Sequence, residues 1–354
     1  MTTILTTTGI SLYINARREY KTDSPTDDQM RQYLRTKPER ASSEANSLLQ
    51  IARHDDQLVL LHTKTPEAKR CADLVRDYFS NEGYKQVRLV PLEFQGDAQH
   101  IETTGLRNLV NTLIDEVESA RRKQSDVVIN ATAGLKAQVV YSTMIGMIYQ
   151  VPVKYIYEDF QRIVTFNPIA LDWDTSLFLS YNTFFKWLDA EPRAQKEVER
   201  YLKDFPDRER IEALLTPPDA DSEVFLSYMG EALRRRFQRE TEEATLAEWP
   251  PAADVKTIDD KIASSLLHRK HHPVKDSLST CYKIAALDCV QEIIGGHFEN
   301  TTHTRLKRVY PDGTILLLWA DNMKAERLTI YTTARGHVQT LKVAEKIKEI
   351  LEIA

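Results

Sequence analysis

The fold of this chain depends on residues 126–157, which begin DVVINATAGLK (126–136) and end VPVKYIY (151–157). The first segment is typical of a buried strand that breaks at a small polar turn, and the apolar residues after Lys136 predict a helix to about Gln150. The last segment predicts a second strand. A strand, a helix and a parallel strand form a βαβ unit. Ligands of such units lie beyond the carboxyl ends of the strands, beside helix N-termini.

The small polar turn places four residues at that position: Asn130, Thr132, Gly134 and Lys136. A comparable turn, residues 9–12, follows a β-branched strand at residues 3–8. Further strands at 57–62 and 85–90 alternate with helices at 67–81 and 105–123, which predicts an α/β Rossmann-like domain over residues 1–170. The chain contains no GxGxxG, so we expect no dinucleotide cofactor.

Length and composition limit the class of protein. A chain of 354 residues with 42% hydrophobic and 28% charged residues is expected to be globular, with two or three domains. It has neither an apolar run long enough for a membrane span nor a basic signal sequence, so we expect a cytoplasmic protein without a membrane partner. The three cysteines lack paired spacing, so we expect no metal site and no disulfide framework.

Residues 171–245 are predicted to form a winged helix-turn-helix domain. They contain apolar-periodic helices, an apolar hairpin-like patch at 224–227 and a last helix at 228–242 with Arg234, Arg235 and Arg236. Three adjacent arginines favour a solvated helix face over a nucleic-acid reader, and both interpretations stay open.

Residues 246–354 are predicted to form an α+β domain. Helices at 258–271 and 274–294 precede strands at 304–310, 314–320 and 327–333, and a helix at 341–353 ends the chain. Residues 251–354 carry 15 basic and 13 acidic side chains and six of the nine histidines. This distribution is consistent with an RNA contact and with an ordinary solvated surface.

The two turns of the first domain resemble those of CARF domains, the cyclic-oligoadenylate sensors of type III CRISPR systems. Gly9-Ile10-Ser11-Leu12 is similar to the first CARF motif, and Asn130-Ala131-Thr132-Ala133-Gly134-Leu135-Lys136 to the second, with Ala133 where the family has a glycine. The resemblance implies an allosteric activator, cyclic oligoadenylate, and we expect cyclic tetra-adenylate because it is the commonest in the family. It also implies a homodimer that binds one symmetric ring. The ligand-binding residues it implies are Gly9, Ile10, Ser11, Leu12, Asn130, Thr132, Ala133, Gly134 and Lys136.

The C-terminal domain is similar to RelE-type mRNA interferases, which cut mRNA in the ribosomal A site. The similar features are the basic strand segment Arg305-Leu306-Lys307-Arg308 and the basic residues Arg335 and His337 after the last strand. The resemblance implies a metal-independent endoribonuclease whose partners are the ribosome and its mRNA. Its implied catalytic residues are Arg305, Lys307, Arg308, Arg335 and His337, with Tyr310 or Tyr331 stacking on a base.

Side chains alternate along a strand, so we expect Arg305 and Lys307 to share a face and to surround one phosphate together with Arg335. Two alternatives remain. One is a CARF–winged-helix transcription regulator that responds to cyclic oligoadenylate and has no nuclease activity. The other adds slow cleavage of the ligand in the sensor, with Ser11 and Lys136 positioning its 2′-hydroxyl and phosphate.

Overall fold

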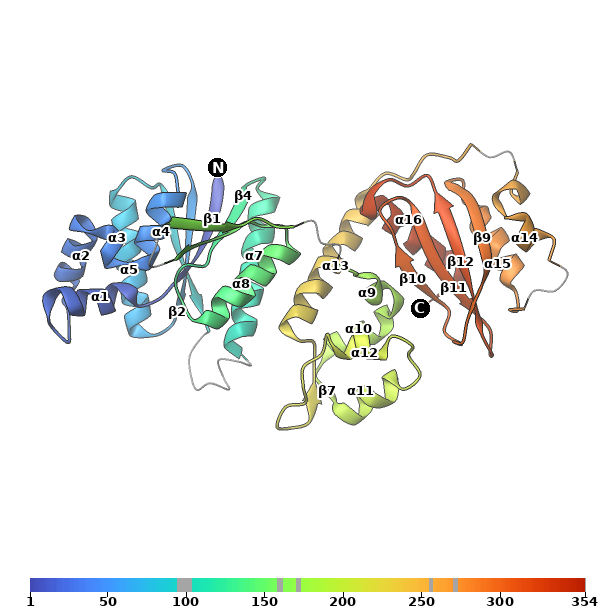
Figure 1. Cartoon of the computed structure of the whole chain (residues 1–354), viewed down its shortest axis with the longest axis horizontal. Helices are drawn as coiled ribbons and strands as arrows, with labels where there is room; N and C mark the ends of the chain where they lie inside the picture. The colour runs from blue at the N-terminus through green and yellow to red at the C-terminus, as the bar shows by residue number, and fades with distance from the viewer. Residues whose placement is uncertain (94–103, 158–161, 170–172, 255–256, 270–272, 354) are drawn as a thin grey trace. The chain divides into compact units, whose positions relative to one another are not determined.

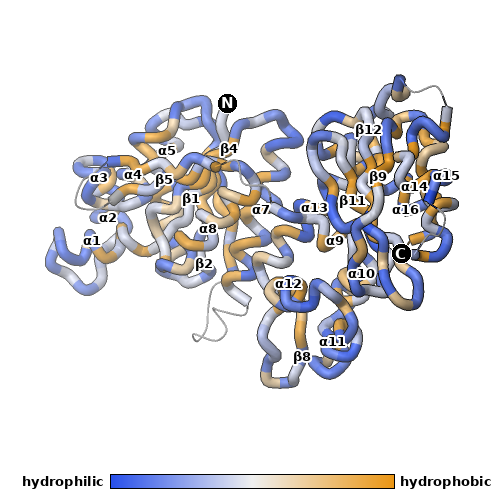
Figure 2. Tube along the Cα trace, turned by 45° about the vertical axis from the view of Figure 1, so that its right-hand side comes forward, coloured by the Kyte–Doolittle hydropathy of each residue, from blue (hydrophilic) through white to orange (hydrophobic). Residues whose placement is uncertain are grey.

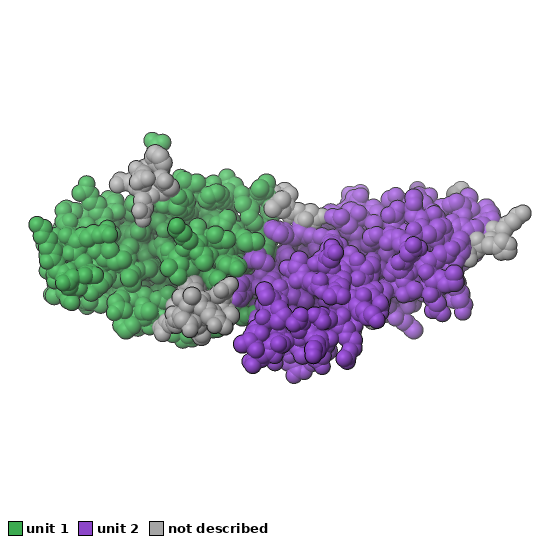
Figure 3. Space-filling model, turned by 60° about the horizontal axis from the view of Figure 1, so that its bottom comes forward, with its two compact units in different colours: residues 1–172 green, residues 173–354 purple. Residues whose placement is uncertain are grey.

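The computed structural model describes residues 1–93, 104–157, 162–169, 173–254, 257–269 and 273–353. Contacts divide the chain into two compact units, residues 1–172 and residues 173–354 (Figure 3). Each unit is described by itself. None of the helices in the described ranges combines the length and the hydropathy that a membrane span needs.

A six-stranded sheet forms the centre of the first unit, in the order β3-β2-β1-β4-β5-β6 (Figure 1). All neighbouring strands are parallel except β5 and β6, which pair antiparallel. The predicted Rossmann-like fold is therefore confirmed, whereas the edge strand β6 was not predicted. The strands are β1 (Thr2–Thr8), β2 (Gln57–Thr63), β3 (Gln86–Leu92), β4 (Asp126–Asn130), β5 (Val153–Tyr157) and β6 (Arg162–Phe166).

Helices connect these strands, and four of them lie between β1 and β2, where none was predicted. Leu12, Met30 and Leu48 of these helices are fully buried in one core with residues of β1 and β2. Figure 2 shows the hydrophobic colour concentrated on the strands and the hydrophilic colour on these outer helices. The helices are α1 (Ser11–Tyr20), α2 (Asp27–Thr36), α3 (Pro38–Ala41), α4 (Ser43–Ile51), α5 (Pro66–Asn81), α7 (Leu106–Arg122) and α8 (Lys136–Ile148).

A four-stranded antiparallel sheet, in the order β10-β11-β12-β9, dominates the second unit. Its strands are β9 (Val290–Glu299), β10 (Arg305–Val309), β11 (Thr314–Ala320) and β12 (Ala325–Thr332). The prediction of a helix over residues 274–294 is wrong in its second half, because α15 (Ser277–Ala285) ends early and β9 begins at Val290. Short apolar runs do not separate helix from strand, and here Ile293 pairs with Ile330 of β12.

The remaining elements of the second unit are mainly helical. They are α9 (Ser176–Ser180), α10 (Asn182–Ala190), α11 (Gln195–Leu202), α12 (Arg208–Glu212), α13 (Tyr228–Leu246), η2 (Asp259–Lys261), α14 (Ser264–Leu267), α16 (Gly336–Leu351) and the short strands β7 (Arg193–Ala194) and β8 (Glu223–Val224). One hydrophobic core joins α9 and α10 to the antiparallel sheet and α16. The regions predicted as winged-helix and RelE-like domains therefore share a core, and their assignment to those two families stays a prediction.

Candidate functional site

The two predicted turns meet at the carboxyl ends of β1 and β4. Thr7 Oγ1 donates a hydrogen bond to the carbonyl oxygen of Ala133, and a Cβ atom added to Gly9 would lie 3.8 Å from the nitrogen of Gly134. β1 and β4 are neighbours at the point where the strand order reverses, which is where open α/β sheets bind ligands. We call residues 9–12 and 130–136 the cradle.

The second turn of the cradle requires glycine at position 134. Its φ is +110°, and an added Cβ would lie only 2.0 Å from Gln138 Oε1. That oxygen accepts a hydrogen bond of 2.8 Å from the nitrogen of Leu135. The turn therefore places the exposed Lys136 as the first residue of α8. An ammonium group at a helix N-terminus suits a phosphate.

Asn130 and Thr132 brace the cradle from inside. Asn130 is fully buried and donates to Ser47 Oγ at 2.8 Å. Thr132 donates to Asn130 Oδ1 at 2.6 Å and accepts from the nitrogen of Ile156 at 3.1 Å, so it does not cap α8. The side chains of Leu12 and Ala133 are buried too. The cradle residues that solvent reaches are Gly9, Ile10, Ser11, Thr132, Gly134, Leu135 and Lys136.

Sequence reasoning missed Glu44, a buried carboxylate directly behind the first turn. Only 1% of Glu44 is exposed, and it accepts hydrogen bonds from the nitrogen of Gly9 at 2.6 Å and from Ser11 Oγ at 2.7 Å. Thr8 Oγ1 is buried beside this turn and finds no hydrogen-bond partner among the described residues. In the sequence Glu44 is an ordinary acidic residue near the start of a short helix, so no motif marks it.

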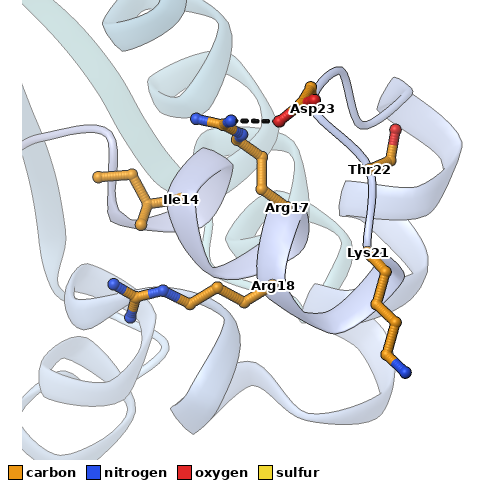
Figure 4. Close-up of a pocket in the computed structure, with 6 residues that line it drawn as sticks. All are labelled: Ile14, Arg17, Arg18, Lys21, Thr22 and Asp23. Carbon is orange, nitrogen blue, oxygen red and sulfur yellow. Dashed lines mark hydrogen bonds and ion pairs between the residues drawn. The ribbon is translucent and has the colours of Figure 1, made fainter.

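A shallow basic pocket of about 370 Å³ lies along α1, beyond the cradle (Figure 4). Arg17 forms an ion pair with Asp23, whereas Arg18 and Lys21 point in different directions. Since its cations do not converge, this pocket is a weaker anion site than the cradle.

Residues 39–169 match the model of a family described as a CRISPR-associated protein, Cas_APE2256. This segment is less than half of the chain. It contains Glu44 and the second turn of the cradle, and it begins after the first turn. A solved structure similar to this chain is that of Can2 from Sulfobacillus thermosulfidooxidans in complex with cyclic tetra-adenylate. The two are 11% identical with a TM-score of 0.28, over 73% of this chain and 71% of that chain.

In the second unit, Arg305 is not available to a phosphate. It is 3% exposed, its Nη2 lies 3.2 Å from Asp207 Oδ2, and its guanidinium carbon lies 5.8 Å from the centre of the Tyr181 ring. Lys307 Nζ lies 2.7 Å from Glu299 Oε1. Arg305 therefore links β10 to the helices of the same unit.

The strand register also corrects the predicted cluster. Arg305 lies opposite Leu318, which lies opposite Arg327 at the start of β12, whereas Arg335 follows the end of that strand. At about 3.3 Å per residue, positions 327 and 335 are separated by roughly 25 Å if the chain stays extended. A bulge between Leu306 and Arg308 breaks the simple alternation. The prediction that Arg305, Lys307 and Arg335 surround one phosphate is therefore wrong.

A different group of residues gathers at the Arg335 end of the sheet. The guanidinium carbon of Arg308 lies 5.0 Å from the centre of the Tyr310 ring. The nitrogen of Tyr310 donates to Thr314, which lies opposite the exposed Tyr331. The nitrogen of Gly336 donates to the carbonyl of Pro311, which holds exposed Arg335 beside the same turn. We call Arg308, Tyr310, Tyr331 and Arg335 the basic-aromatic end.

His337 faces α13, where its Nε2 lies 3.4 Å from Oε2 of the buried Glu240. On the same helix, Arg234 is 5% exposed and pairs with Asp189 at 3.1 Å, and Arg236 pairs with Glu240 at 2.7 Å. Neutralising Arg234 or Arg236 would therefore disturb packing, so it is a poor test of DNA binding.

Two carboxylates of this unit, the partly buried Asp207 and the buried Glu240, should make its stability depend on pH. Burial acts to raise the pKa of Asp207, but the hydrogen bond from Tyr181 and the charge of Arg305 outweigh burial, so this pKa is lowered. The pKa of Glu240 is lowered in the same way by His337 and Arg236. Such groups stabilise the fold above their unfolded-state pKa, and that stability is lost as the pH falls through the folded-state pKa.

We therefore expect the free energy of unfolding to fall as the pH drops below about 4.5. Urea unfolding between pH 7 and pH 3 measures it. The variant with both Asp207→Asn and Glu240→Gln should be less stable at pH 7 and show a flatter pH dependence. Parallel pH profiles of the two proteins would contradict the assignment.

Proposed function

We propose that this protein is a ribosome-dependent endoribonuclease, activated by cyclic oligoadenylate, that cleaves mRNA in the ribosomal A site during type III CRISPR defence. The observation that carries the proposal is the meeting of the two turns at the β1–β4 edge, with Ser11 and Lys136 both open to solvent. The match of residues 39–169 to a CRISPR-associated family supports it.

The cradle has the chemistry to bind a phosphodiester. Lys136 supplies a charge, and the start of α8 supplies backbone N–H groups and the positive end of the helix dipole. Gly134 lets the backbone approach closely. A ring of four adenylates, which has twofold symmetry, would engage two such cradles in a homodimer.

A face of α8 suits this homodimer. Val140 and Met144 are four residues apart on the helix and are 56% and 36% exposed, and Leu135 before them is 52% exposed. The side chains of Val140 and Met144 therefore lie along one side of α8 and are exposed within the described part of the chain. The face adjoins Lys136, as a dimer with two neighbouring cradles requires.

We expect the double substitution Val140→Asp and Met144→Asp to convert the dimer to a monomer, because pairing would bury four unpaired carboxylates. Sedimentation equilibrium measures the mass. The control Arg122→Asp and Lys123→Asp, at the end of α7, should leave the dimer intact. A variant that stays dimeric would show that α8 is not the interface.

The basic-aromatic end is the nuclease site that we propose in place of the predicted cluster. Cleavage by the 2′-hydroxyl of RNA needs stabilisation of charge on the phosphate, and Arg308 and Arg335 supply it. Tyr310 or Tyr331 would stack on a base and hold the nucleotide in line.

A translation assay with and without each cyclic oligoadenylate, followed by mapping of the mRNA ends, tests the proposal. We expect cleavage within ribosome-bound codons only when cyclic tetra-adenylate is present. Intact mRNA with every ring size would contradict the nuclease, and cleavage of naked RNA would contradict the need for the ribosome. Ligand-dependent DNA binding without cleavage would favour the transcription regulator.

A further inference from the structure

The buried Glu44 determines how the first turn of the cradle meets a ligand. It lies on α4 and receives three hydrogen bonds: Gly9 N to Oε1 at 2.6 Å, Ser11 Oγ to Oε2 at 2.7 Å and Ser42 Oγ to Oε2 at 2.6 Å. Burial of a carboxylate is costly unless donors surround it, and these donors meet that need. Glu44 is therefore held firmly, and it in turn holds Ser11.

The hydrogen bonds of the Ser11 hydroxyl leave one of its lone pairs without a donor. A serine hydroxyl has one proton to donate and two lone pairs that accept. Ser11 Oγ donates its proton to Glu44 and accepts from the nitrogen of Ser43 at 3.1 Å. One lone pair remains, and Ser11 is partly open to solvent at the cradle. The Ser11 hydroxyl thus offers a ligand an acceptor and no donor.

A phosphate ester offers only acceptors and gains nothing from that lone pair. The nitrogen of Gly9 is also committed to Glu44, so neither the Gly9 N–H nor the Ser11 hydroxyl is left to donate to a phosphate. A ribose 2′-hydroxyl is a donor and suits the remaining lone pair. The two turns of the cradle therefore suit different groups of the ligand: Lys136 and the start of α8 suit phosphate, and the Ser11 hydroxyl suits a ribose hydroxyl.

We infer that Glu44 is a positioning residue that makes Ser11 an acceptor for a ligand 2′-hydroxyl, so that the cradle selects ribose over 2′-modified rings. This inference rests on the proposed cyclic-oligoadenylate sensor and adds to it the part of the ligand that the first turn recognises. Glu44 acts through Ser11 and does not itself touch the ligand.

Calorimetry of the full-length protein with two rings tests the inference: cyclic tetra-adenylate and its fully 2′-fluoro analogue. Fluorine keeps the ribose-like sugar pucker but removes the donor. We expect the wild type to bind the ribose ring at least about tenfold more tightly, because the analogue leaves the Ser11 lone pair unpaired. In Glu44→Gln the side-chain amide can donate to Ser11 Oγ, which leaves the Ser11 hydroxyl proton free to point towards the ligand. The ratio of the affinities for the ribose ring and the 2′-fluoro ring should then fall towards one.

Two further variants keep the test decisive if Glu44→Gln folds poorly. Ser11→Ala removes the acceptor and should lose the preference, whereas Ser42→Ala leaves the Ser11–Glu44 bond and should retain it. Equal binding of both rings by the wild type would overturn the inference while leaving the sensor in place. A preference that persists in Glu44→Gln but not in Ser11→Ala would show that Glu44 does not orient Ser11. Failure of the wild type to bind either ring would overturn the proposed function and this inference with it.

Discussion

Lys136→Glu should weaken the binding of cyclic tetra-adenylate by at least about 100-fold and abolish ligand-stimulated mRNA cleavage. Lys136 is exposed, and no side chain of the described structure depends on it for a hydrogen bond that the fold needs. The substitution replaces an attraction to phosphate by a repulsion. In a homodimer one ring contacts two cradles, so the substitution weakens the binding of that ring at both of them.

The matched control is Lys85→Glu, the same change at another exposed lysine. Lys85 precedes β3 and so lies at the opposite edge of the parallel sheet from the cradle. It should bind the ring as the wild type does, with an unchanged melting temperature in both variants. Tight binding by Lys136→Glu would remove the cradle as the ligand site, and weak binding by both variants would indicate a general effect of net charge.

The cradle could be predicted from the sequence because its parts are backbone features. A glycine after a strand and a short polar turn before a helix leave local signatures, and parallel strands bring their carboxyl ends to one edge. Glu44 could not be predicted, since it reaches Gly9 only through the packing of α4 against the first turn, a tertiary contact that the local sequence does not show.

The basic segment 305–308 was misread for a related reason. A run of cations in a strand indicates charge but not exposure, and the environment of Arg305 is set by Asp207, about a hundred residues earlier in the chain. The bulge between Leu306 and Arg308 then changes which side chains share a face. Both facts depend on tertiary contacts that no local pattern contains.

Replacing Arg335 and Arg305 by alanine should give opposite results. Arg335→Ala should lower ribosome-dependent cleavage by about 100- to 1000-fold, as removal of a group that stabilises transition-state charge does, and leave the melting temperature unchanged because this side chain is exposed. Arg305→Ala should lower the free energy of unfolding by about 3 kcal/mol, the lower end of the range for breaking a buried ion pair. The loss is at the lower end because Asp207 still accepts the hydrogen bond from Tyr181 and still pairs with Arg210.

Thermal unfolding and single-turnover cleavage, measured on the same preparations, separate the two roles. The exposed Arg200 on α11 provides the control, and Arg200→Ala should change neither quantity. Where Arg305→Ala remains folded at low temperature, it should still cleave, because its guanidinium group is turned towards Asp207 and away from RNA. A stable Arg305→Ala variant without activity would instead show that Arg305 belongs to the nuclease site. Full activity in Arg335→Ala would show that the basic-aromatic end is not that site.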